Sequence, residues 1–351
     1  MVFLLTGGAG FIGNALIRHI LMQSDHQVVN LDNLTYSSCL FALQDFNENP
    51  RYKFIEGDIR DAEVVSSAFD VFQPDVVINL AAESHVDRSI ENPRTFIETN
   101  IVGTFILLQS SLDYWKGLTG KRKETFRFHH VSTDEVYGYL ELNESPFTES
   151  TPYNPSSPYA ASKASSDHLV RSFNRTYSLP TLLTNCANNY GAFQHPEKFI
   201  PNVILRGLNS KEILIYGDGS QIRDWLFVDD HARALLMVAE SGVVGETYNI
   251  GAHNEITNLT LAQLICEILD DVNSSKSNIY ESHAELIQFV RDRPGHDKRY
   301  AIDSSKVTKD IGWRPSTPFQ VGLRDTVIWY LENQKRISSL VSRTVLTKRL
   351  G

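Results

Sequence analysis

The first half of the chain alternates short apolar runs with segments whose apolar residues recur at helical spacing. The apolar runs, which predict strands, are Val2–Thr6, Gln27–Leu31, Tyr52–Glu56, Pro74–Leu80 and Phe126–Val131. The helical segments between them are Asn14–Met22, Val64–Phe72 and Thr99–Leu112. Continuous apolar runs are typical of parallel strands that are buried on both faces. The alternation therefore predicts an α/β fold built on a doubly wound, Rossmann-type parallel sheet.

The second half follows a proline-rich connector and repeats the alternation less regularly. It predicts a helix from Tyr159 to about Tyr177, a strand over Thr181–Ala187, a helix over Asp229–Ala239 and a strand over Thr247–Ile250. We expect the last two elements to return to the first domain. A smaller α/β domain would then be interleaved with the larger one.

A glycine-rich turn joins the first predicted strand to the first helix. Gly7, Gly10 and Gly13 are spaced for a tight turn, for close approach of the backbone to a pyrophosphate and for close helix packing. The second strand ends in Asp32, 19 residues after Gly13, where a carboxylate accepts hydrogen bonds from adenosine ribose hydroxyls. A carboxylate there repels a 2′-phosphate, and Asn33 rather than an arginine follows it. The pattern therefore predicts NAD, rather than NADP, as the cofactor.

Polar residues stand at the end of the fifth predicted strand, in the stretch His-His-Val-Ser-Thr-Asp-Glu-Val-Tyr-Gly at 129–138. Ligands of open α/β sheets bind outside the carboxyl ends of the strands. Thr133, Asp134 and Glu135 are therefore candidates for chemistry, with a plain helix cap as the alternative for the first two. Adjacent strand residues face opposite ways, so both acids reach one ligand only if the chain leaves strand geometry after Thr133.

Tyr159 and Lys163 open the helix that follows the proline-rich connector. Residues four apart share one face of a helix. An ammonium beside the phenol is expected to lower the pKa of Tyr159 from its reference of about 10, which makes the phenolate available as a base. Such a pair also occurs on plain helix surfaces. Its position after a dinucleotide turn and a hydroxyl-bearing strand end favours catalysis.

Composition narrows the possible classes of protein. The 351 residues are 42% hydrophobic and 21% charged, which is typical of a globular chain, and a net charge of −9 argues against a nucleic-acid partner. The three scattered cysteines, Cys39, Cys186 and Cys266, fit a reducing compartment, and no metal-ligand spacing is present, so no metal site is expected. Without a basic leader or an apolar run of about 20 residues, we expect no membrane span and a cytoplasmic location.

Long sequence blocks between residue 5 and about 303 resemble the dTDP-glucose 4,6-dehydratase family of extended short-chain dehydrogenases/reductases. The blocks are TGGAGFIG, LAAESHVDRSI, STDEVYG, YAASKASSDHLV, NNYG with PEKFIPNVI, IYGDGSQIRDWLFVDDHARAL and RDRPGHDKRYAID. The resemblance implies a hydro-lyase that binds NAD and a sugar nucleotide, with dTDP-glucose favoured. It also implies a homodimer formed through the helices at Thr99–Leu112 and Tyr159–Tyr177.

The resemblance further implies a redox-neutral dehydration that feeds deoxysugar biosynthesis. NAD takes a hydride from glucose C4 while Tyr159 removes the O4 proton, Lys163 supports Tyr159 and holds the nicotinamide ribose, and Thr133 hydrogen-bonds O4. Glu135 then removes the C5 proton, and Asp134 protonates the departing C6 hydroxyl. Return of the hydride to C6 and of a proton to C5 gives the 4-keto-6-deoxy sugar nucleotide.

Two sets of binding residues and a domain division complete these expectations. The cofactor set is Gly7, Gly10, Phe11, Ile12, Gly13, Asp32, Asn33, Leu34, Thr35, Asp58, Ile59, Leu80, Ala81, Ala82, Ser84, Thr99, Tyr159, Lys163 and Asn189. The substrate set is Ser84, Thr133, Asn188, Lys198, Phe199, Leu214, Ile215, Tyr216, Arg223, Asn258, Asp292, Arg293, Pro294, Gly295 and His296. The NAD-binding domain is expected at 1–183 with return segments at about 224–250 and 301–317, and the sugar-nucleotide-binding domain at about 184–223, 251–300 and 318–351.

Alternatives remain open for the charged segments and for the substrate. Arg223 and the basic run at 291–299 offer forked donors for a pyrophosphate, with a solvated charged face as the alternative. The segment 192–195 departs from the family pattern near the substrate. Thymine and uracil differ by one methyl group, worth about 1–3 kcal/mol, so a UDP-glucose 4,6-dehydratase stays possible. A sugar-nucleotide 4-epimerase has no use for the Asp–Glu pair, and a non-catalytic NAD-binding scaffold usually loses its Tyr or Lys.

Overall fold

The larger lobe is built on a parallel sheet. The structure is a computed structural model that describes residues 1–272, 281–292 and 294–337. Within these residues the main sheet has seven strands in the order β10-β6-β5-β4-β1-β2-β3, and every neighbouring pair is parallel. The strands are β1 (Val2–Thr6), β2 (Gln27–Asp32), β3 (Tyr52–Glu56), β4 (Val76–Asn79), β5 (Arg127–Thr133), β6 (Thr181–Cys186) and β10 (Thr247–Ile250). The predicted doubly wound sheet is confirmed.

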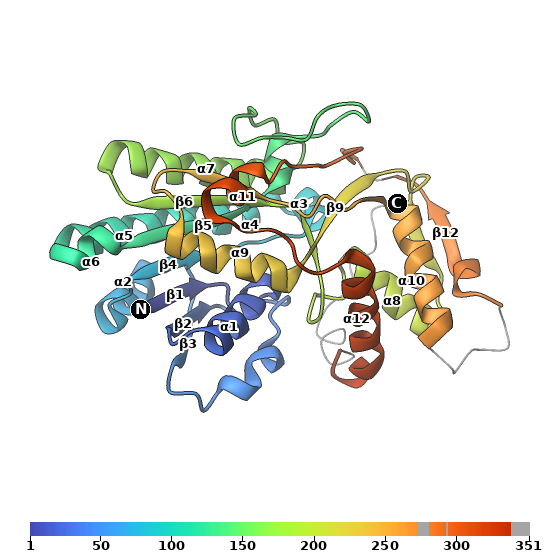
Figure 1. Cartoon of the computed structure of the whole chain (residues 1–351), viewed down its shortest axis with the longest axis horizontal. Coiled ribbons are helices and arrows are strands. Elements are labelled where there is room, and N and C mark those ends of the chain that lie inside the picture. Colours follow the sequence, from blue (N-terminus) through green and yellow to red (C-terminus); the bar gives the residue numbers. More distant parts are fainter. Residues whose placement is uncertain (273–280, 293, 338–351) are drawn as a thin grey trace.

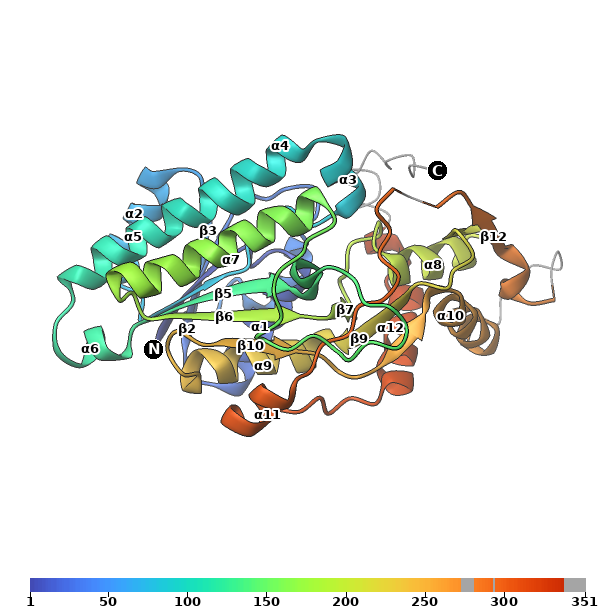
Figure 2. The same ribbon diagram turned by 90° about the horizontal axis from the view of Figure 1, so that it is seen from above.

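Helices cover both faces of this sheet (Figures 1 and 2). One face carries α1 (Phe11–Gln23) and α9 (Val228–Ser241); the other carries α2 (Ala62–Phe72), α5 (Thr104–Gly117) and α7 (Pro158–Tyr177). Because successive strand residues face opposite ways, Leu5 packs with Ile17 and Leu235 on the first face. Its neighbour Leu4 packs with Leu108 on the second. Burial on both sides explains why the strands read as continuous apolar runs.

The helix predicted at Thr99–Leu112 is longer and less regular than expected. It begins with α4 (Pro93–Phe96), continues through the π-helical segment η2 (Ile97–Gly103) and ends with α5. The wide turn of η2 carries Asn100, whose amide bonds both backbone groups of Glu83 at 2.9 and 3.0 Å and the Ser162 hydroxyl at 2.8 Å. These hydrogen bonds connect the loop after β4 to α7. The periodicity of apolar residues in the sequence does not predict such bonds or the π-helical turn that they accompany.

Short helices fill the remaining connections of the larger lobe. They are η1 (Leu40–Phe46), α3 (Val86–Glu91), α6 (Gly120–Thr125), η3 (Asp134–Tyr137) and α11 (Ser305–Ile311). No helix in the described residues is long and apolar enough to cross a membrane.

The smaller lobe, on the right of Figure 1, combines two small sheets with helices. One sheet has the order β11-β9-β7, with β7 (Asn188–Tyr190), β9 (Ile222–Phe227) and β11 (Glu255–Thr257); the other pairs β8 (Ile213–Tyr216) with β12 (Ile287–Val290). Around them lie α8 (Phe199–Leu208), α10 (Asn258–Val272), η4 (His283–Leu286) and α12 (Phe319–Glu332). Ile204, Trp225, Ile265 and Leu323 are buried together in its core. The segment after Ala187 forms strand β7.

The chain passes between the lobes several times. Strand β10 pairs with β6 in the main sheet, whereas β11, which follows it, pairs with β9 in the smaller lobe. Helix α9 packs against α1, and α11 packs against β10. We therefore keep the interleaved division at 1–183, 224–250 and 301–317 against the remaining segments as a proposal, which these contacts support.

Candidate active site

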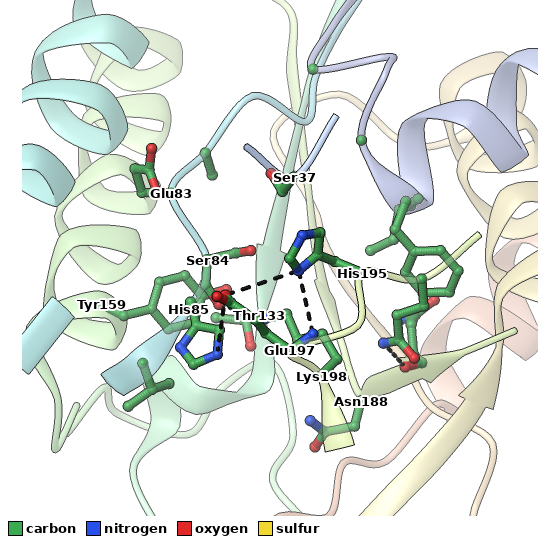
Figure 3. A pocket seen from close by; sticks show the side chains of 18 of the residues that line it. Ser37, Glu83, Ser84, His85, Thr133, Tyr159, Asn188, His195, Glu197 and Lys198 are labelled. Carbon is green, nitrogen blue, oxygen red and sulfur yellow. Dashed lines mark hydrogen bonds and ion pairs between the residues drawn. The ribbon is translucent and has the colours of Figure 1, made fainter. Parts of the chain in front are cut away.

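A cavity of about 860 Å³ opens at the carboxyl ends of the main-sheet strands and extends to residues of the smaller lobe (Figure 3). It brings together residues of β2, β5 and β6 and the residues that directly follow β1 and β4 with residues of α7, α8 and β8. Nearly all of the predicted catalytic, cofactor and substrate residues line it. The exceptions among the described residues are Leu34, Ile215, Asp292, Pro294 and Gly295. The predicted residue Arg293 lies outside the described residues. Two sets that were predicted from distant parts of the sequence therefore meet in one place.

The exceptions have local reasons. Leu214 and Tyr216 line the cavity, whereas Ile215 lies between them on β8 and is fully buried in the core, because alternate strand residues face opposite sides. Leu34 has a left-handed φ of 52° and donates its backbone N–H to the Asp32 carboxylate at 2.9 Å. Asp292 accepts a hydrogen bond at 2.6 Å from His296, and His296 itself lines the cavity.

The glycine turn fits a dinucleotide pyrophosphate. Gly7 has φ of +71°, and a Cβ at this position would lie 2.6 Å from the backbone nitrogen of Ala81, so only glycine is accommodated. Gly10 begins α1 with no side-chain cap, which leaves the amides of the first turn available to an anion. The turn, the start of a 13-residue helix and the Ala81-Ala82 strand end all border the same cavity.

Asp32 has a structural role as well as a position for ribose binding. Its carboxylate accepts hydrogen bonds from Ala9 N–H at 2.9 Å, Leu34 N–H at 2.9 Å and Ser38 Oγ at 3.1 Å. Burial raises the pKa of Asp32, and these three donors oppose that effect. The bonds fix the carboxylate against the glycine turn while one edge still lines the cavity. The residues present therefore fit NAD.

The chain leaves strand geometry directly after Thr133. Strand β5 ends at this residue, and the 3₁₀ turn η3 begins at Asp134. Thr133 caps the turn by accepting a hydrogen bond from Glu135 N–H at 3.3 Å. The cap that was considered as the alternative to chemistry is therefore present. It is also what allows adjacent Asp134 and Glu135 to line one cavity.

The surroundings of Asp134 favour the protonated form of its carboxyl. It is 1% exposed, and its Oδ2 has no hydrogen-bond partner within the described part of the chain. Burial raises the pKa of Asp134 well above its usual value, and the charges of Glu135 and Asp224 add to the rise. Both effects favour the protonated form of the carboxyl, which can act as a general acid. No group of three or more His, Cys, Asp or Glu that could hold a metal ion occurs among the described residues.

Tyr159 and Lys163 share a face of α7 as predicted, but the predicted pKa of Tyr159 is wrong in direction. Burial raises this pKa well above 10, the charge of Glu135 raises it further, and a hydrogen bond with Thr133 only partly opposes the rise. Lys163 donates from Nζ to the Val131 carbonyl at 2.8 Å. The pattern of residue types does not show how deeply Tyr159 is buried. Its burial raises the pKa by more than the nearby ammonium was expected to lower it.

Aromatic residues and one buried arginine form the end of the cavity in the smaller lobe. Arg223 is 5% exposed and donates to the carbonyls of Ile222 at 2.8 Å and Asp297 at 2.9 Å. Its guanidinium lies 4.2 Å from the ring centroid of Tyr300, which also lines the cavity. Carbonyls and a ring face thus fix the orientation of this cation at the cavity wall, which is incompatible with a freely solvated charge.

Several lining residues were not predicted, and the most connected of them surround Glu197 (Figure 3). Glu197 accepts hydrogen bonds from Arg88 at 2.6 and 3.2 Å, and its carboxylate lies 3.7 Å from His85 and 3.9 Å from His195. The Arg88 guanidinium lies 3.8 Å from the ring centroid of Tyr36. His85 and Glu197 lie inside the sequence blocks that carry the family resemblance, and this was the signal that could have identified them. No pattern in the sequence indicated that they contact each other across about a hundred residues.

Comparison with known proteins follows this geometry. The chain matches a protein-family model described as GDP-mannose 4,6 dehydratase over residues 4–326. It is 55% identical over 333 residues to a dTDP-glucose 4,6-dehydratase of Neisseria gonorrhoeae, covering 95% of this chain and 96% of that protein. The chain belongs to the dTDP-glucose 4,6-dehydratase family. A second dTDP-glucose 4,6-dehydratase, from Escherichia coli strain K12, is 53% identical over 350 residues, with 97% and 96% covered.

Solved structures place this dehydratase-family chain in a fold shared by two activities. A dTDP-glucose 4,6-dehydratase from Streptomyces venezuelae, solved with NAD bound, has a TM-score of 0.87 and 40% identity, covering 97% of this chain and 100% of that one. A UDP-glucose 4-epimerase from Thermotoga maritima has a TM-score of 0.82 and 30% identity, covering 95% and 100%. The fold alone therefore does not separate a dehydratase from an epimerase, and the residues of the site have to do so.

Proposed function

We propose that this chain converts dTDP-glucose into dTDP-4-keto-6-deoxyglucose and water, using NAD, as a step of deoxysugar biosynthesis. The observation that carries the proposal is the presence of two extra carboxyls, Asp134 and Glu135, in one cavity with Tyr159 and Lys163. Oxidation at C4, the step shared with epimerases, requires a base and its supporting groups. Elimination of water requires an acid and a second base, and this cavity contains both.

The glycine turn and the first turn of α1 would hold the pyrophosphate of NAD, Asp32 the adenosine ribose and Lys163 the nicotinamide ribose. When bound, NAD supplies the hydride acceptor for C4 and the hydride donor for C6. Tyr159 removes the proton from O4, and its raised pKa makes the phenolate a strong base once formed. Thr133, which hydrogen-bonds the Tyr159 phenol, orients O4 and favours the phenolate.

The ketone at C4 acidifies the hydrogen at C5, which permits elimination by two carboxyls. Glu135 removes the C5 proton, and Asp134, protonated because it is buried, donates its proton to the C6 hydroxyl, which leaves as water. Glu135 then returns a proton to C5. Positioned proton transfers of this kind typically contribute about 10²–10⁴-fold each. The burial that favours the protonated form of Asp134, beside a Glu135 that is only partly buried, supports this assignment of roles.

The nucleotide end of the substrate is proposed to lie in the smaller lobe. Arg223 and His296, like Lys198 and Arg206, are cationic or protonatable groups of the cavity wall there, and Arg223 and His296 suit a pyrophosphate. Leu214 and Tyr216, which project from β8, suit the base and its ribose. The predicted contacts of Asn188, Lys198, Phe199 and Asn258 with substrate remain part of the proposal, supported by their place in the cavity wall.

A homodimer and a cytoplasmic location belong to the same proposal. Ile97, Val102, Phe105 and Tyr177 are 50, 44, 44 and 47% exposed on η2, α5 and α7, and these are the elements expected to form the interface. Three free, buried cysteines support a reducing compartment.

Turnover of dTDP-glucose and UDP-glucose, compared by the alkali absorbance of the 4-keto-6-deoxy product, tests the proposal. We expect kcat/KM to be about 10- to 200-fold higher for the thymine nucleotide, the range that one methyl group provides in a fitted pocket. A preference for UDP-glucose would support the uridine dehydratase instead. A C4 epimer formed without loss of water would identify an epimerase, and no turnover of either nucleotide would favour a non-catalytic role.

A further inference from the structure

A buried polar cluster packs against Lys163, and none of the roles above uses it. It consists of His130 on β5 with Ser166 and Asp167 on α7, which are 1, 0 and 0% exposed. Lys163 itself is 3% exposed. Burying a charged group at this depth lowers the stability of the fold unless a partner of opposite charge or hydrogen bonds compensate it, so the cluster requires an explanation.

The hydrogen-bond network fixes the tautomer of His130. Ala81 N–H donates to Thr6 Oγ1 at 3.3 Å, so the Thr6 hydroxyl donates its own proton to Asn79 Oδ1 at 2.7 Å. The Asn79 amide nitrogen is therefore the atom that faces His130 Nδ1, at 3.1 Å. Because Nδ1 accepts this bond, the ring proton of the neutral imidazole is on Nε2.

The Nε2 proton of His130 points toward α7. Nε2 lies 3.1 Å from Ser166 Oγ and 3.4 Å from Asp167 Oδ1, and Ser166 Oγ donates onward to the Lys163 carbonyl at 2.8 Å. Lys163 Nζ lies 3.4 Å from the same Nε2. Both nitrogens carry protons, so this contact is not a hydrogen bond. Burial and then the charge of Lys163 lower the pKa of His130 to about 4, which leaves the imidazole neutral and the ammonium uncompensated by it.

Asp167 is held as a carboxylate by several donors. Its Oδ2 accepts from Ser132 Oγ at 2.9 Å, Tyr153 OH at 2.9 Å and Asn185 Nδ2 at 3.3 Å. Burial raises the pKa of Asp167, but the neighbouring His130 and Lys163 and the Ser132 bond outweigh it and lower the pKa overall. Its Oδ1, which has no hydrogen bond within the described chain, is the atom that faces His130.

We propose that Asp167 is the buried counter-charge of Lys163, that His130 fixes the separation between them, and that Asp167 thereby keeps Lys163 an oriented ammonium. Asp167 is a positioning residue, since it touches neither reacting atom. The other titratable groups around Lys163 are His130 on β5, Cys186 on β6 and Tyr159 on α7, with Asp134 and Glu135 of η3 acting on Cys186 and Tyr159. The inference rests on the role proposed above for Lys163.

The competing explanation is that Asp167 serves Arg171. Arg171 donates to the Tyr153 hydroxyl at 2.8 Å, and Tyr153 donates to Asp167, so the arginine reaches the carboxylate through one phenol. Arg171 lines a second, smaller cavity of about 420 Å³ and is only partly buried. Water can solvate a partly buried guanidinium, whereas the Lys163 side chain is only 3% exposed. The two explanations differ in which cation is energetically coupled to Asp167.

A double-mutant cycle on thermal unfolding separates these explanations. Asp167→Asn and Lys163→Met are each expected to lower Tm, because each leaves one buried charge alone, and the double variant is expected to be no less stable than the worse single variant. The matched cycle pairs Asp167→Asn with Arg171→Met and is expected to be additive. Additivity for Lys163, or stronger coupling to Arg171, would overturn the proposal. If Asp167→Asn yields no folded protein, recovery of folding in the Lys163→Met double variant supports the proposal and continued failure overturns it.

The second readout is the titration midpoint of Lys163, followed by NMR with ε-¹³C lysine and assigned by its loss in Lys163→Met. A nearby carboxylate raises the pKa of an ammonium, so Asp167→Asn is expected to lower the midpoint by about one pH unit or more. Tyr153→Phe, which keeps the Asp167 charge, is expected to leave the midpoint near its wild-type value. An unchanged midpoint in Asp167→Asn contradicts the proposal. Wild-type turnover of dTDP-glucose, measured in parallel, reports on the proposed function alone.

Discussion

Asp134 and Glu135 are neighbours in the chain and line the same cavity, but their side chains are buried to different extents. Asp134 is 1% exposed, whereas Glu135 is only partly buried. Each carboxyl needs the opposite protonation state from its neighbour if one is to donate and the other to accept. The 3₁₀ turn after Thr133 provides this difference, because it turns one side chain into the interior while both still line the cavity.

Glu135→Gln is predicted to separate oxidation from elimination. Tyr159 is the proposed base for O4, so NADH is still expected to form transiently, but the C5 proton then has no acceptor and the yield of 6-deoxy product falls by about 10²-fold or more. Stopped-flow absorbance of NADH together with product assay measures both steps. Tyr159→Phe is the control and is expected to form no NADH. Near-wild-type dehydration by Glu135→Gln would contradict the assignment of the two carboxyls.

Asp134→Asn is predicted to stabilise the protein more at high pH than at low pH. The folded pKa of Asp134 is raised well above the unfolded value of about 3.9, so the stability linked to its proton is complete below that value and is lost as pH rises through the folded pKa. Asparagine does not titrate. Between pH 4 and pH 8 the stability of the variant relative to wild type is therefore expected to rise, while dehydration is lost. Denaturant unfolding measures the gain, and a difference independent of pH would contradict it.

At the scale of elements, the site depends on how a strand ends and a helix begins. Strand β1 passes into α1 through a glycine with positive φ, and α7 presents Tyr159 and Lys163 two and six residues after its cap. Capping and turn geometry therefore determine the position of cofactor and catalytic groups.

Gly7→Ala is predicted to abolish tight NAD binding and to destabilise the protein by about 1–3 kcal/mol. Alanine is strained at a φ of +71°, and its Cβ would lie 2.6 Å from the Ala81 nitrogen. Gly117→Ala is the matched control, because it has ordinary φ and nothing within 4 Å of the added Cβ. Cofactor content after purification and Tm measure the two effects. Full NAD content in Gly7→Ala would refute the proposed use of the turn.

Ser157→Ala is predicted to cost about 1 kcal/mol of stability. The Ser157 hydroxyl accepts the Ala160 N–H at 3.1 Å and caps the start of α7. Ser172→Ala on the exposed side of the same helix is the control, expected to change stability by less than about 0.5 kcal/mol. Urea unfolding of the two variants gives the comparison. Equal effects would show that the cap does not stabilise α7.

Most strands of the main sheet were predictable because both their faces are buried and their side chains are largely apolar, as in β1 and β4. The π-helical turn of η2 was not, because it depends on the bonds of Asn100 to a distant loop and to Ser162. Burial at the site was equally invisible in the sequence. For this reason the pKa of Tyr159 was expected to fall, whereas it rises.

For the whole molecule, the arrangement of the lobes decides which predicted residues meet. Motifs from the glycine turn at Gly7 to His296 line one cavity, although the chain crosses between lobes several times before it completes the wall. Sequence blocks indicated most members of that wall. They gave no sign of the contact between Arg88 and Glu197, which joins α3 to the start of α8 across 109 residues.

The central claim is that hydride leaves C4 and returns to C6 of the same sugar while water is lost. The most direct measurement is mass spectrometry and NMR of the product formed from dTDP-glucose that carries deuterium at C4. The expected product is lighter by one water molecule and carries the deuterium in the new methyl group at C6. A product of unchanged mass with inverted C4, or a dehydrated product that has lost the deuterium to solvent, would contradict the claim.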